Sequence, residues 1–510
     1  MKTVSKYLFG YNFECTRRFG YGGIYAEMID DCRLLYTDRS FYPIAFDDME
    51  GLGQCGERIH FLTDRSYAWH IVAEGKVSVR FRTEYGKLIF ASGEPRGVFQ
   101  NKFDCPYARM EVVSDGKIKY ISLKPADAVN NCRKDVLDAI KEMRPQTIRF
   151  PGGCFAEKYR WKDGLLPIED RPAISDEGKF NLFCSHYRYD GYELNIDDYI
   201  AICRYVGAEP EWTVKLTKND PQDAADLVEY CNGDASTKYG ALRIARGFRE
   251  PYNIRTWYIG NEVCFITTPE AAAALHDQFA AAMLSVDPTI KTVATTGNVE
   301  NWDIKFLANA TMVDRCAQHS YIEYNIPSCD LQQVLDAAEG ALYRRLEAGC
   351  KRFGGRKMLF DEWNLRWGSM GDAYGGLYAA GVMTLLIRNQ EQLNLEGASY
   401  FALVNEGIIR VYHDHVTLAP DGEIMKRMTE HAGGTLVPCG DTSMVVTDHG
   451  DYLWISVLNK SVSDEKLLDD IDGAYEIFTP DRENMKRVCG NGRLLSIPPA
   501  SAAFIKRPKT

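Results

Sequence analysis

KMLFDEWN, residues Lys357–Asn364, places three apolar residues directly before an acidic pair, a tryptophan and an asparagine. Such a run is typical of a buried parallel strand whose carboxyl end opens into a site. A second segment, Thr256–Glu262 (TWYIGNE), has the same design, because an aromatic and β-branched run ends in an amide beside a carboxylate. We predict that Glu262 and Glu362 lie at two strand ends and face one pocket. Cleavage of a glycosidic bond by acid/base and nucleophilic catalysis requires such a pair.

Strand-like and helix-like segments alternate on both sides of these two stretches. Apolar residues at helical spacing end at Met143, and Asp220-Pro221 and Thr268-Pro269 are helix starts with proline in the first turn. Repeated units of this kind favour a (β/α)8 barrel with its active site at the carboxyl ends of the strands. We predict eight barrel strands, at about 7–14, 147–150, 211–216, 256–262, 290–295, 313–319, 357–362 and 396–404.

Two other regions alternate with a period of two and carry Gly-Lys and Asp-Gly turns, which is typical of small β-sandwiches. At 510 residues the chain is also long enough for several domains. We therefore expect an α/β protein in which a (β/α)8 TIM barrel carries an inserted N-terminal β-sandwich-like domain and a C-terminal β-sandwich. The predicted boundaries are 1–32 for the first barrel strand, 33–124 for the insertion, 125–431 for the rest of the barrel and 432–510 for the C-terminal sandwich.

Composition and charge narrow the class of partner. The chain has 45% hydrophobic and 26% charged residues, an ordinary globular composition, and a net charge of -11. An acidic chain cannot easily assemble a basic face, so we expect no nucleic acid and no anionic membrane as partner. A neutral or polyhydroxylated ligand fits better, and aromatic side chains could stack on sugars.

The cysteines and the N-terminus indicate the compartment. The fifteen cysteines are odd in number and include no CxxC pair, which favours reduced thiols over a disulfide framework. The N-terminal residues lack an apolar signal region, and no stretch approaches 18 uninterrupted apolar residues. We therefore expect a cytoplasmic protein.

Several motifs together resemble glycoside hydrolase family 51, which is best known for α-L-arabinofuranosidases. They are GGIYAE at 22–27, RFPGG at 149–153, WKDG at 161–164, GNE at 260–262 and FDEWN at 360–364. The similarity covers most of the barrel. It implies a retaining enzyme with a barrel and a C-terminal β-sandwich, and some family members carry a carbohydrate-binding-like insertion after the first strand.

The resemblance also implies residue roles. Glu262 would be the general acid/base and Glu362 the nucleophile. Arg149 would hold Glu362 ionised by lowering its pKa. The substrate-binding positions would be Glu14, Arg149, Cys154, Asn261, His319 and Tyr321. Arg149 could instead bridge a buried carboxylate, and His319 could be a core histidine.

Three positions depart from the family pattern. Cys154 stands where the family usually has an asparagine that binds furanose hydroxyls, Ala402 replaces an expected glutamine in strand eight, and Arg366 replaces a common aromatic. These are substrate-side positions. They affect the identity of the sugar more than the reaction.

The leading hypothesis is a retaining, exo-acting α-L-arabinofuranosidase that acts on a small oligosaccharide or glycoside. A β-glycosidase, or an endo-glucanase or xylosidase on the same barrel, is one alternative, and a catalytically silent carbohydrate-binding protein is another. We expect no cofactor and no metal, because His413-X-His415 is the only close histidine pair and lacks an acidic or histidine cluster placed by a helix. The family's frequent hexamers make a homo-oligomer plausible.

Overall fold

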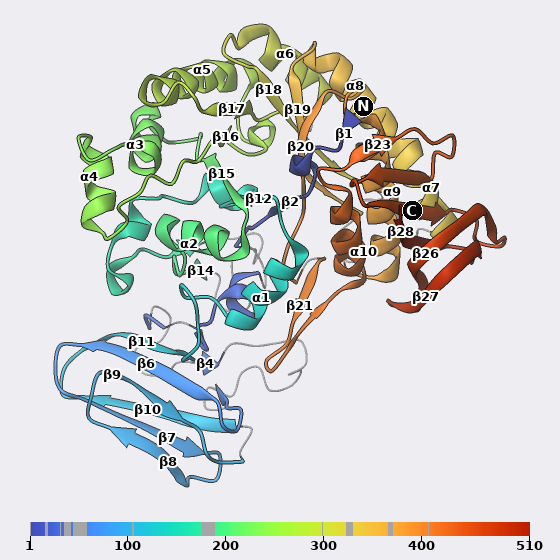
Figure 1. Cartoon of the computed structure of the whole chain (residues 1–510). Helices are drawn as coiled ribbons and strands as arrows, with labels where there is room; N and C mark the ends of the chain where they lie inside the picture. The colour runs from blue at the N-terminus through green and yellow to red at the C-terminus, as the bar shows by residue number, and fades with distance from the viewer. Residues whose placement is uncertain are drawn as a thin grey trace.

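The computed structural model describes residues 2–15, 19–30, 32–34, 42–43, 59–104, 107–175, 189–297, 299–322, 330–365, 371–405 and 407–509. At its centre eight parallel strands close into a barrel (Figure 1). In order around the barrel these strands are β12 (Thr147–Phe150), β15 (Glu209–Val214), β16 (Thr256–Ile259), β17 (Lys291–Ala294), β18 (Arg315–Tyr321), β19 (Lys357–Asn364), β20 (Leu395–Tyr400) and β2 (Gly10–Asn12). The predicted (β/α)8 barrel is confirmed, and each predicted strand contributes to it.

Helices surround the barrel and begin where the sequence places their caps. The Asp220 side chain accepts a hydrogen bond from the N–H of Gln222, and the Thr268 side chain accepts one from the N–H of Ala271. A proline follows each of these capping residues in the first turn of its helix. The helices before β19 are α1 (Lys134–Met143), α2 (Ile196–Val206), α3 (Pro221–Asn232), α4 (Lys238–Ala245), α5 (Pro269–Val286), α6 (Glu300–Asn309), α7 (Leu331–Ala337) and α8 (Tyr343–Phe353).

The helix α9 (Ala373–Asn389), between β19 and β20, was not predicted. Fourteen of its residues are buried, so it lacks the polar stripe by which an amphipathic helix is recognised. It packs against α10 (Pro420–Met428) and against strands of the C-terminal sheet. This helix therefore joins the barrel to the C-terminal part of the chain.

Two antiparallel sheets form the region inserted after the first barrel strand. One has the order β5 (Ile59–His60), β10 (Tyr107–Ser114), β7 (Val77–Thr83) and β8 (Leu88–Ser92), and the other β11 (Ile118–Pro125), β6 (Ser66–Ala73) and β9 (Arg96–Gln100). They share a separate core that includes Tyr67, Trp69, Phe81 and Phe99. Much of the beginning of the predicted insertion, 35–41 and 44–58, lies outside the described residues.

The C-terminal residues form a seven-stranded antiparallel sheet. Its order is β1 (Lys2–Thr3), β23 (Thr435–Val437), β24 (Met444–Asp448), β25 (Tyr452–Asn459), β28 (Ser501–Pro508), β26 (Lys466–Asp481) and β27 (Asn484–Ile497). The first strand of the chain is thus an edge strand of the last sheet, since Lys2 pairs with Leu436. The β-rich C-terminal region is confirmed, and this contribution of the N-terminus was not predicted.

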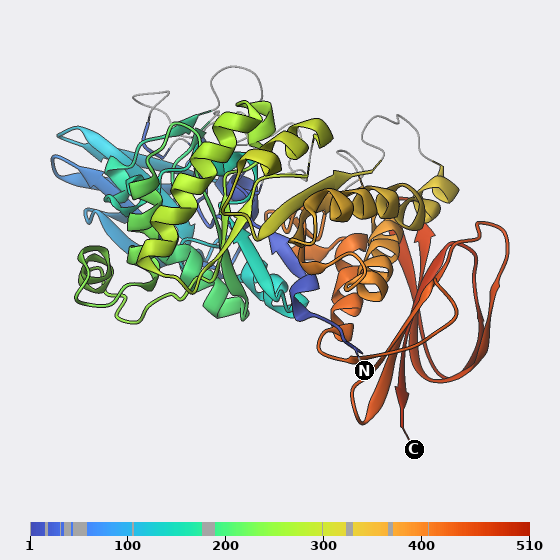
Figure 2. The same cartoon turned by 90° about the horizontal axis from the view of Figure 1, so that it is seen from above.

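In both views the barrel lies between the inserted sheets, drawn in blue, and the C-terminal sheet, drawn in red (Figure 2). The inserted strand β11 also contacts β3 (Ile29–Asp30), which follows the first barrel strand. Within the described ranges, every helix is too short or too polar to cross a membrane.

Candidate active site

The two predicted glutamates lie at the carboxyl ends of β16 and β19, the fourth and seventh barrel strands when they are counted along the chain from β2. Glu262 follows β16 in a left-handed conformation with φ of 46°, which is uncommon for a residue other than glycine. Glu362 lies within β19 and is 6% exposed. A carboxylate oxygen of each residue and a ring nitrogen of His319 all lie within 4.8 Å of one another. The two glutamates therefore share one site, as the sequence predicts.

His319, on β18, bridges the two glutamates. Its Nδ1 lies 2.8 Å from Glu262 Oε1 and 3.6 Å from Glu362 Oε2, and its Nε2 lies 3.3 Å from Asp361 Oδ2. Ala317 pairs with Leu359 but His319 pairs with Glu362, so β19 holds one extra residue at this point. Neighbouring residues of a regular strand face opposite sides, and this bulge lets Asp361 and Glu362 reach the same histidine.

Two further groups hold the Glu362 carboxylate. The Tyr321 hydroxyl donates to Oε1 at 2.6 Å, and Arg149 Nη1 lies 3.5 Å from Oε2. Tyr321 and His319 lie two residues apart on β18 and point to the same side. These contacts leave the carboxylate little rotational freedom, as a nucleophile must attack along one direction.

Arg149, on β12, is the centre of the network beneath the site. It donates to Asn12 Oδ1 at 3.0 Å and to Asn261 Oδ1 at 2.7 Å, and Nη2 lies 3.5 Å from Asp361 Oδ2. Its guanidinium stacks 4.6 Å from the ring centroid of Tyr258. The planar guanidinium holds its N–H donors in a fixed arrangement, so it can satisfy several acceptors in one plane and stack on a ring at the same time. Arg149 therefore also pairs with a buried carboxylate, that of Asp361, which is the alternative considered from the sequence.

Glu14, in the segment after β2, is 3% exposed and accepts a hydrogen bond from the N–H of Phe155 at 2.9 Å. Its Oε2 and Glu362 Oε2 both lie 2.9 Å from the point that a Cβ on Gly153 would occupy. The same point is 3.4 Å from Asn261 Nδ2. Gly153 therefore packs its backbone directly against the site, and a side chain at this position has no room.

We expect Gly153→Ala to reduce kcat/KM by roughly 10²-fold, because the added methyl group displaces two carboxylates from their positions. The thermal unfolding temperature should fall as well, since both carboxylates are buried and held by hydrogen bonds. Gly207→Ala, at a helix end where a Cβ meets nothing within 4 Å, is a control for stability because its φ of 84° strains alanine without touching the site. Undiminished activity in Gly153→Ala would contradict the described packing.

Burial raises the pKa of Glu362, and the negative charge of Glu262 raises it further. His319, Arg149 and the Tyr321 hydroxyl act in the opposite direction without reversing the shift. Arg149 does lower the pKa of Glu362, as predicted, but the loss of hydration outweighs the cation and the net shift is upward. For His319 the balance is the opposite. Burial lowers its pKa, but the carboxylates of Glu362 and Asp361 outweigh burial and hold the pKa well above 6.5.

Burial and the neighbouring Glu362 raise the pKa of Glu14 from 4.5 to about 8. The folded chain then keeps a proton that the unfolded chain releases between these two pH values. Stability should therefore fall as the pH rises through this window. Glutamine at this position cannot titrate. We therefore expect the thermal unfolding temperature of Glu14→Gln to fall less between pH 5 and pH 8 than that of the unmodified chain. Glu209→Gln, at the exposed start of β15, should match the unmodified chain, and an equal loss in all three would contradict the assignment.

The remaining predicted residues take different positions. Cys154 is exposed, with Sγ 3.9 Å from Glu262 Oε2 and 4.0 Å from Asn261 Nδ2. It therefore lies at the site, as predicted. Ala402 is buried in the main core, and Arg366 lies outside the described residues.

Sequence reasoning assigned no role to Asn12, Asp361 or Glu157. Glu157 accepts hydrogen bonds from the N–H groups of Thr217 at 2.9 Å and Asn261 at 3.3 Å, so it holds the loop that carries Glu262. Asn12 could have been found, because it precedes Glu14 by two residues and so faces the same side of its strand. No local signal marks Glu157, whose partners are distant in sequence.

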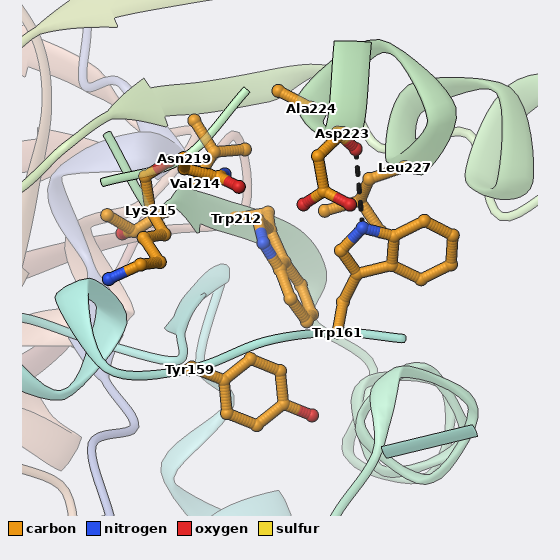
Figure 3. Close-up of a pocket in the computed structure, with 10 residues that line it drawn as sticks. Tyr159, Trp161, Trp212, Val214, Lys215, Asn219, Asp223, Ala224 and Leu227 are labelled. Carbon is orange, nitrogen blue, oxygen red and sulfur yellow. Dashed lines mark hydrogen bonds between the residues drawn. The ribbon is translucent and has the colours of Figure 1, made fainter. Parts of the chain in front are cut away.

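A small cavity lies at the end of β15 (Figure 3). Tyr159, Trp161 and Trp212 surround it, and the indole N–H of Trp161 donates to the Asp223 carbonyl at 3.3 Å. Its free volume of about 10 Å³ suits one water molecule and no sugar. Lys215, which also lines it, donates to the Glu157 carbonyl. The lining of the cavity therefore contacts Glu157, a residue that supports the site.

An eight-stranded parallel barrel with two glutamates paired at its strand ends is the arrangement that barrel glycoside hydrolases use. The family model described as the alpha-L-arabinofuranosidase 1 domain matches residues 139–338, which include Glu262 and end before Glu362. Over these residues, which make up less than half of its length, the chain is similar to this family of arabinofuranosidase domains.

Curated relatives match part of the chain. It is 30% identical over 254 residues to an intracellular exo-alpha-(1->5)-L-arabinofuranosidase of Acetivibrio thermocellus, covering 46% of the chain and 49% of the relative. It is 31% identical over 271 residues to alpha-L-arabinofuranosidase C of Emericella nidulans, covering 47% and 52%. The chain thus spans about half the length of the curated relatives it matches.

Solved structures match the fold over the whole chain. The arabinose complex of an alpha-L-arabinofuranosidase from Thermotoga maritima aligns with a TM-score of 0.69 and 20% identity, covering 100% of this chain and 98% of that one. The GH51 alpha-L-arabinofuranosidase from Thermotoga petrophila aligns with a TM-score of 0.67 and 21% identity, covering 99% and 97%. At these identities the likeness establishes the architecture.

Proposed function

We propose that this chain is a retaining, exo-acting α-L-arabinofuranosidase in which Glu362 is the nucleophile and Glu262 the general acid/base. The observation that carries the proposal is the short separation of the two carboxylates, with an oxygen of each within 4.8 Å. Retaining glycosidases place these groups about 5 to 5.5 Å apart, whereas inverting enzymes leave about 6.5 to 9.5 Å for a water molecule. The spacing supports double displacement.

In the first step Glu362 attacks the anomeric carbon and the bond to the leaving group breaks. Glu262 transfers its proton to the departing oxygen, so an alcohol leaves and a glycosyl ester of Glu362 forms. Tyr321, which donates to Oε1 of Glu362, holds that oxygen while the other attacks. The buried Arg149 lies beside Oε2 and stabilises the carboxylate when it is released again.

In the second step Glu262, now ionised, takes a proton from water. The resulting hydroxide equivalent attacks the anomeric carbon from the face that the leaving group vacated, and the ester bond to Glu362 breaks. The side chain of Glu262 is 20% exposed while that of Glu362 is 8% exposed. The greater exposure of Glu262 suits an acid/base that exchanges protons with water, and the burial of Glu362 suits a nucleophile that must be shielded from water.

The proposed substrate is a small arabinofuranosyl oligosaccharide or glycoside. We assign the substrate side of the site to Glu14, Arg149, Cys154, Asn261, His319 and Tyr321. The relatives' names support this sugar, since the matched Acetivibrio and Emericella proteins are called arabinofuranosidases. A β-glycosidase is the second candidate, because Cys154 places a thiol, a weak hydrogen-bond former, beside Glu262.

A panel of aryl glycosides that differ only in the sugar tests the proposal. We expect the α-L-arabinofuranoside to give the highest kcat/KM, and NMR of the first-formed sugar to show a retained anomeric configuration. Highest activity on a β-D-xylopyranoside or β-D-glucopyranoside would favour the second candidate. Binding of arabinose without hydrolysis of any member would indicate a silent carbohydrate-binding protein, and an inverted product would contradict double displacement.

We also propose a cytoplasmic location and a homo-oligomer, hexameric as in the resembled family. The location is supported by the word intracellular in the name of the Acetivibrio relative and by the free thiols of the cysteines within the described residues. The role of the inserted sheets in binding carbohydrate stays a prediction.

A further inference from the structure

Asp361 is a fully buried carboxylate next to Glu362 that takes no direct part in the proposed reaction. Its Oδ1 accepts a hydrogen bond from the N–H of Gln318 at 3.2 Å. Its Oδ2 lies 3.3 Å from His319 Nε2 and 3.5 Å from Arg149 Nη2. The backbone and the guanidinium therefore fix this carboxylate in place on one side of the imidazole.

The contact with Asp361 determines which way the imidazole faces. With Nε2 directed at Asp361, Nδ1 points toward Glu262 at 2.8 Å and Glu362 at 3.6 Å. An ionised carboxylate only accepts hydrogen bonds, so acceptors lie at both ring nitrogens. The imidazolium, which donates from both nitrogens, satisfies this arrangement.

The charged groups that face His319 come from two elements. Glu262 approaches from the loop after β16, and Asp361 and Glu362 approach from β19. Arg149, on β12, pairs with both of these β19 carboxylates. His319 is therefore in contact with three carboxylates, which favour its charged form even though the ring is buried.

We propose that Asp361 is a positioning residue that keeps His319 as a cation between Glu262 and Glu362. His319 then donates to Oε1 of Glu262 and leaves Oε2 to protonate the leaving group. The same cation stabilises the Glu262 carboxylate that forms when the proton is given up, and the Glu362 carboxylate that is released in the second step. This inference deepens the proposed function and rests on it for its catalytic meaning.

The ionisation of His319 can be measured without any substrate. In the full chain labelled with ¹⁵N-histidine, we expect both ring nitrogens of His319 to stay protonated well above the ordinary histidine pKa of about 6.5. The signal is assigned by its absence in His319→Gln. In Asp361→Asn the titration should move down by at least about one pH unit. Asp303→Asn, which removes another buried aspartate that pairs with Arg352 and contacts no histidine in the described residues, should leave it unchanged.

A His319 that loses its second ring proton at or below pH 6.5 in the unmodified chain would overturn the inference, even if Asp361→Asn failed to fold. An unchanged titration in folded Asp361→Asn would overturn it as well. With active enzyme, Asp361→Asn should lose at least about tenfold more kcat/KM on a poor alkoxide leaving group than on an activated phenolate, because the acid is misplaced. Equal losses on both would indicate a structural role. If no glycoside is cleaved, the proposed function fails while the titration still decides the state of His319.

Discussion

Replacing Glu362 with alanine is expected to abolish turnover of every substrate, with a loss of roughly 10⁴-fold or more in kcat. The variant lacks the carboxylate that forms the glycosyl ester, and neighbouring groups cannot replace it. Tyr321 and Arg149, its present partners, would face an empty space rather than the anomeric carbon. The measurement is kcat on an aryl α-L-arabinofuranoside, compared with one that carries an alkyl leaving group.

Glu209→Gln is the matched control. Glu209 also lies on a barrel strand, but at the start of β15, where it is exposed and pairs with Lys6 at 2.7 Å. Because active sites of such barrels lie at the opposite, carboxyl end of the strands, this variant should keep the activity of the unmodified chain. Full activity in Glu362→Ala would remove Glu362 from the mechanism.

Replacing Glu262 with alanine should have an effect that depends on the leaving group. Substrates that leave as poor alkoxides need a proton and should slow by about 10²- to 10⁴-fold. An activated phenolate leaves unaided, so the first step on such a substrate should be largely spared and the glycosyl-enzyme should accumulate. Burst kinetics on an activated aryl glycoside measure this directly.

Added azide separates the roles of the two glutamates. In Glu262→Ala it should attack the glycosyl-enzyme and give a glycosyl azide of retained configuration. In Glu362→Ala it should enter from the side of the missing carboxylate and give the inverted azide. NMR of the product distinguishes the two, and the opposite pairing of variant and product would mean that the two roles are reversed.

The barrel could be predicted from the sequence because its strands are buried on both faces. Runs such as Lys357–Asn364 are apolar until the strand end, where polar residues begin. The caps at Asp220 and Thr268 are short-range signals and were also predictable. By contrast, α9 is buried on all sides and has no polar face to reveal its period, and the pairing of Lys2 with Leu436 joins the two ends of the chain.

The candidate site was predictable as far as strand ends define it. Glu262 and Glu362 follow directly from their positions after β16 and within β19. The contact of Asp361 with His319 depends on an extra residue in β19, and such a bulge has no signature in this sequence. The sign of the pKa shift of Glu362 was also beyond sequence reasoning, because it is a balance between burial and several charges.

Trapping the covalent intermediate tests the central claim most directly. Glu262→Ala is mixed with an activated aryl α-L-arabinofuranoside, quenched in acid and examined by mass spectrometry of the intact chain and of its peptides. We predict that the chain gains one pentosyl unit and that the modified peptide carries it on Glu362. A pentosyl unit on another residue, or release of an inverted sugar with no modified chain at any time, would contradict the account.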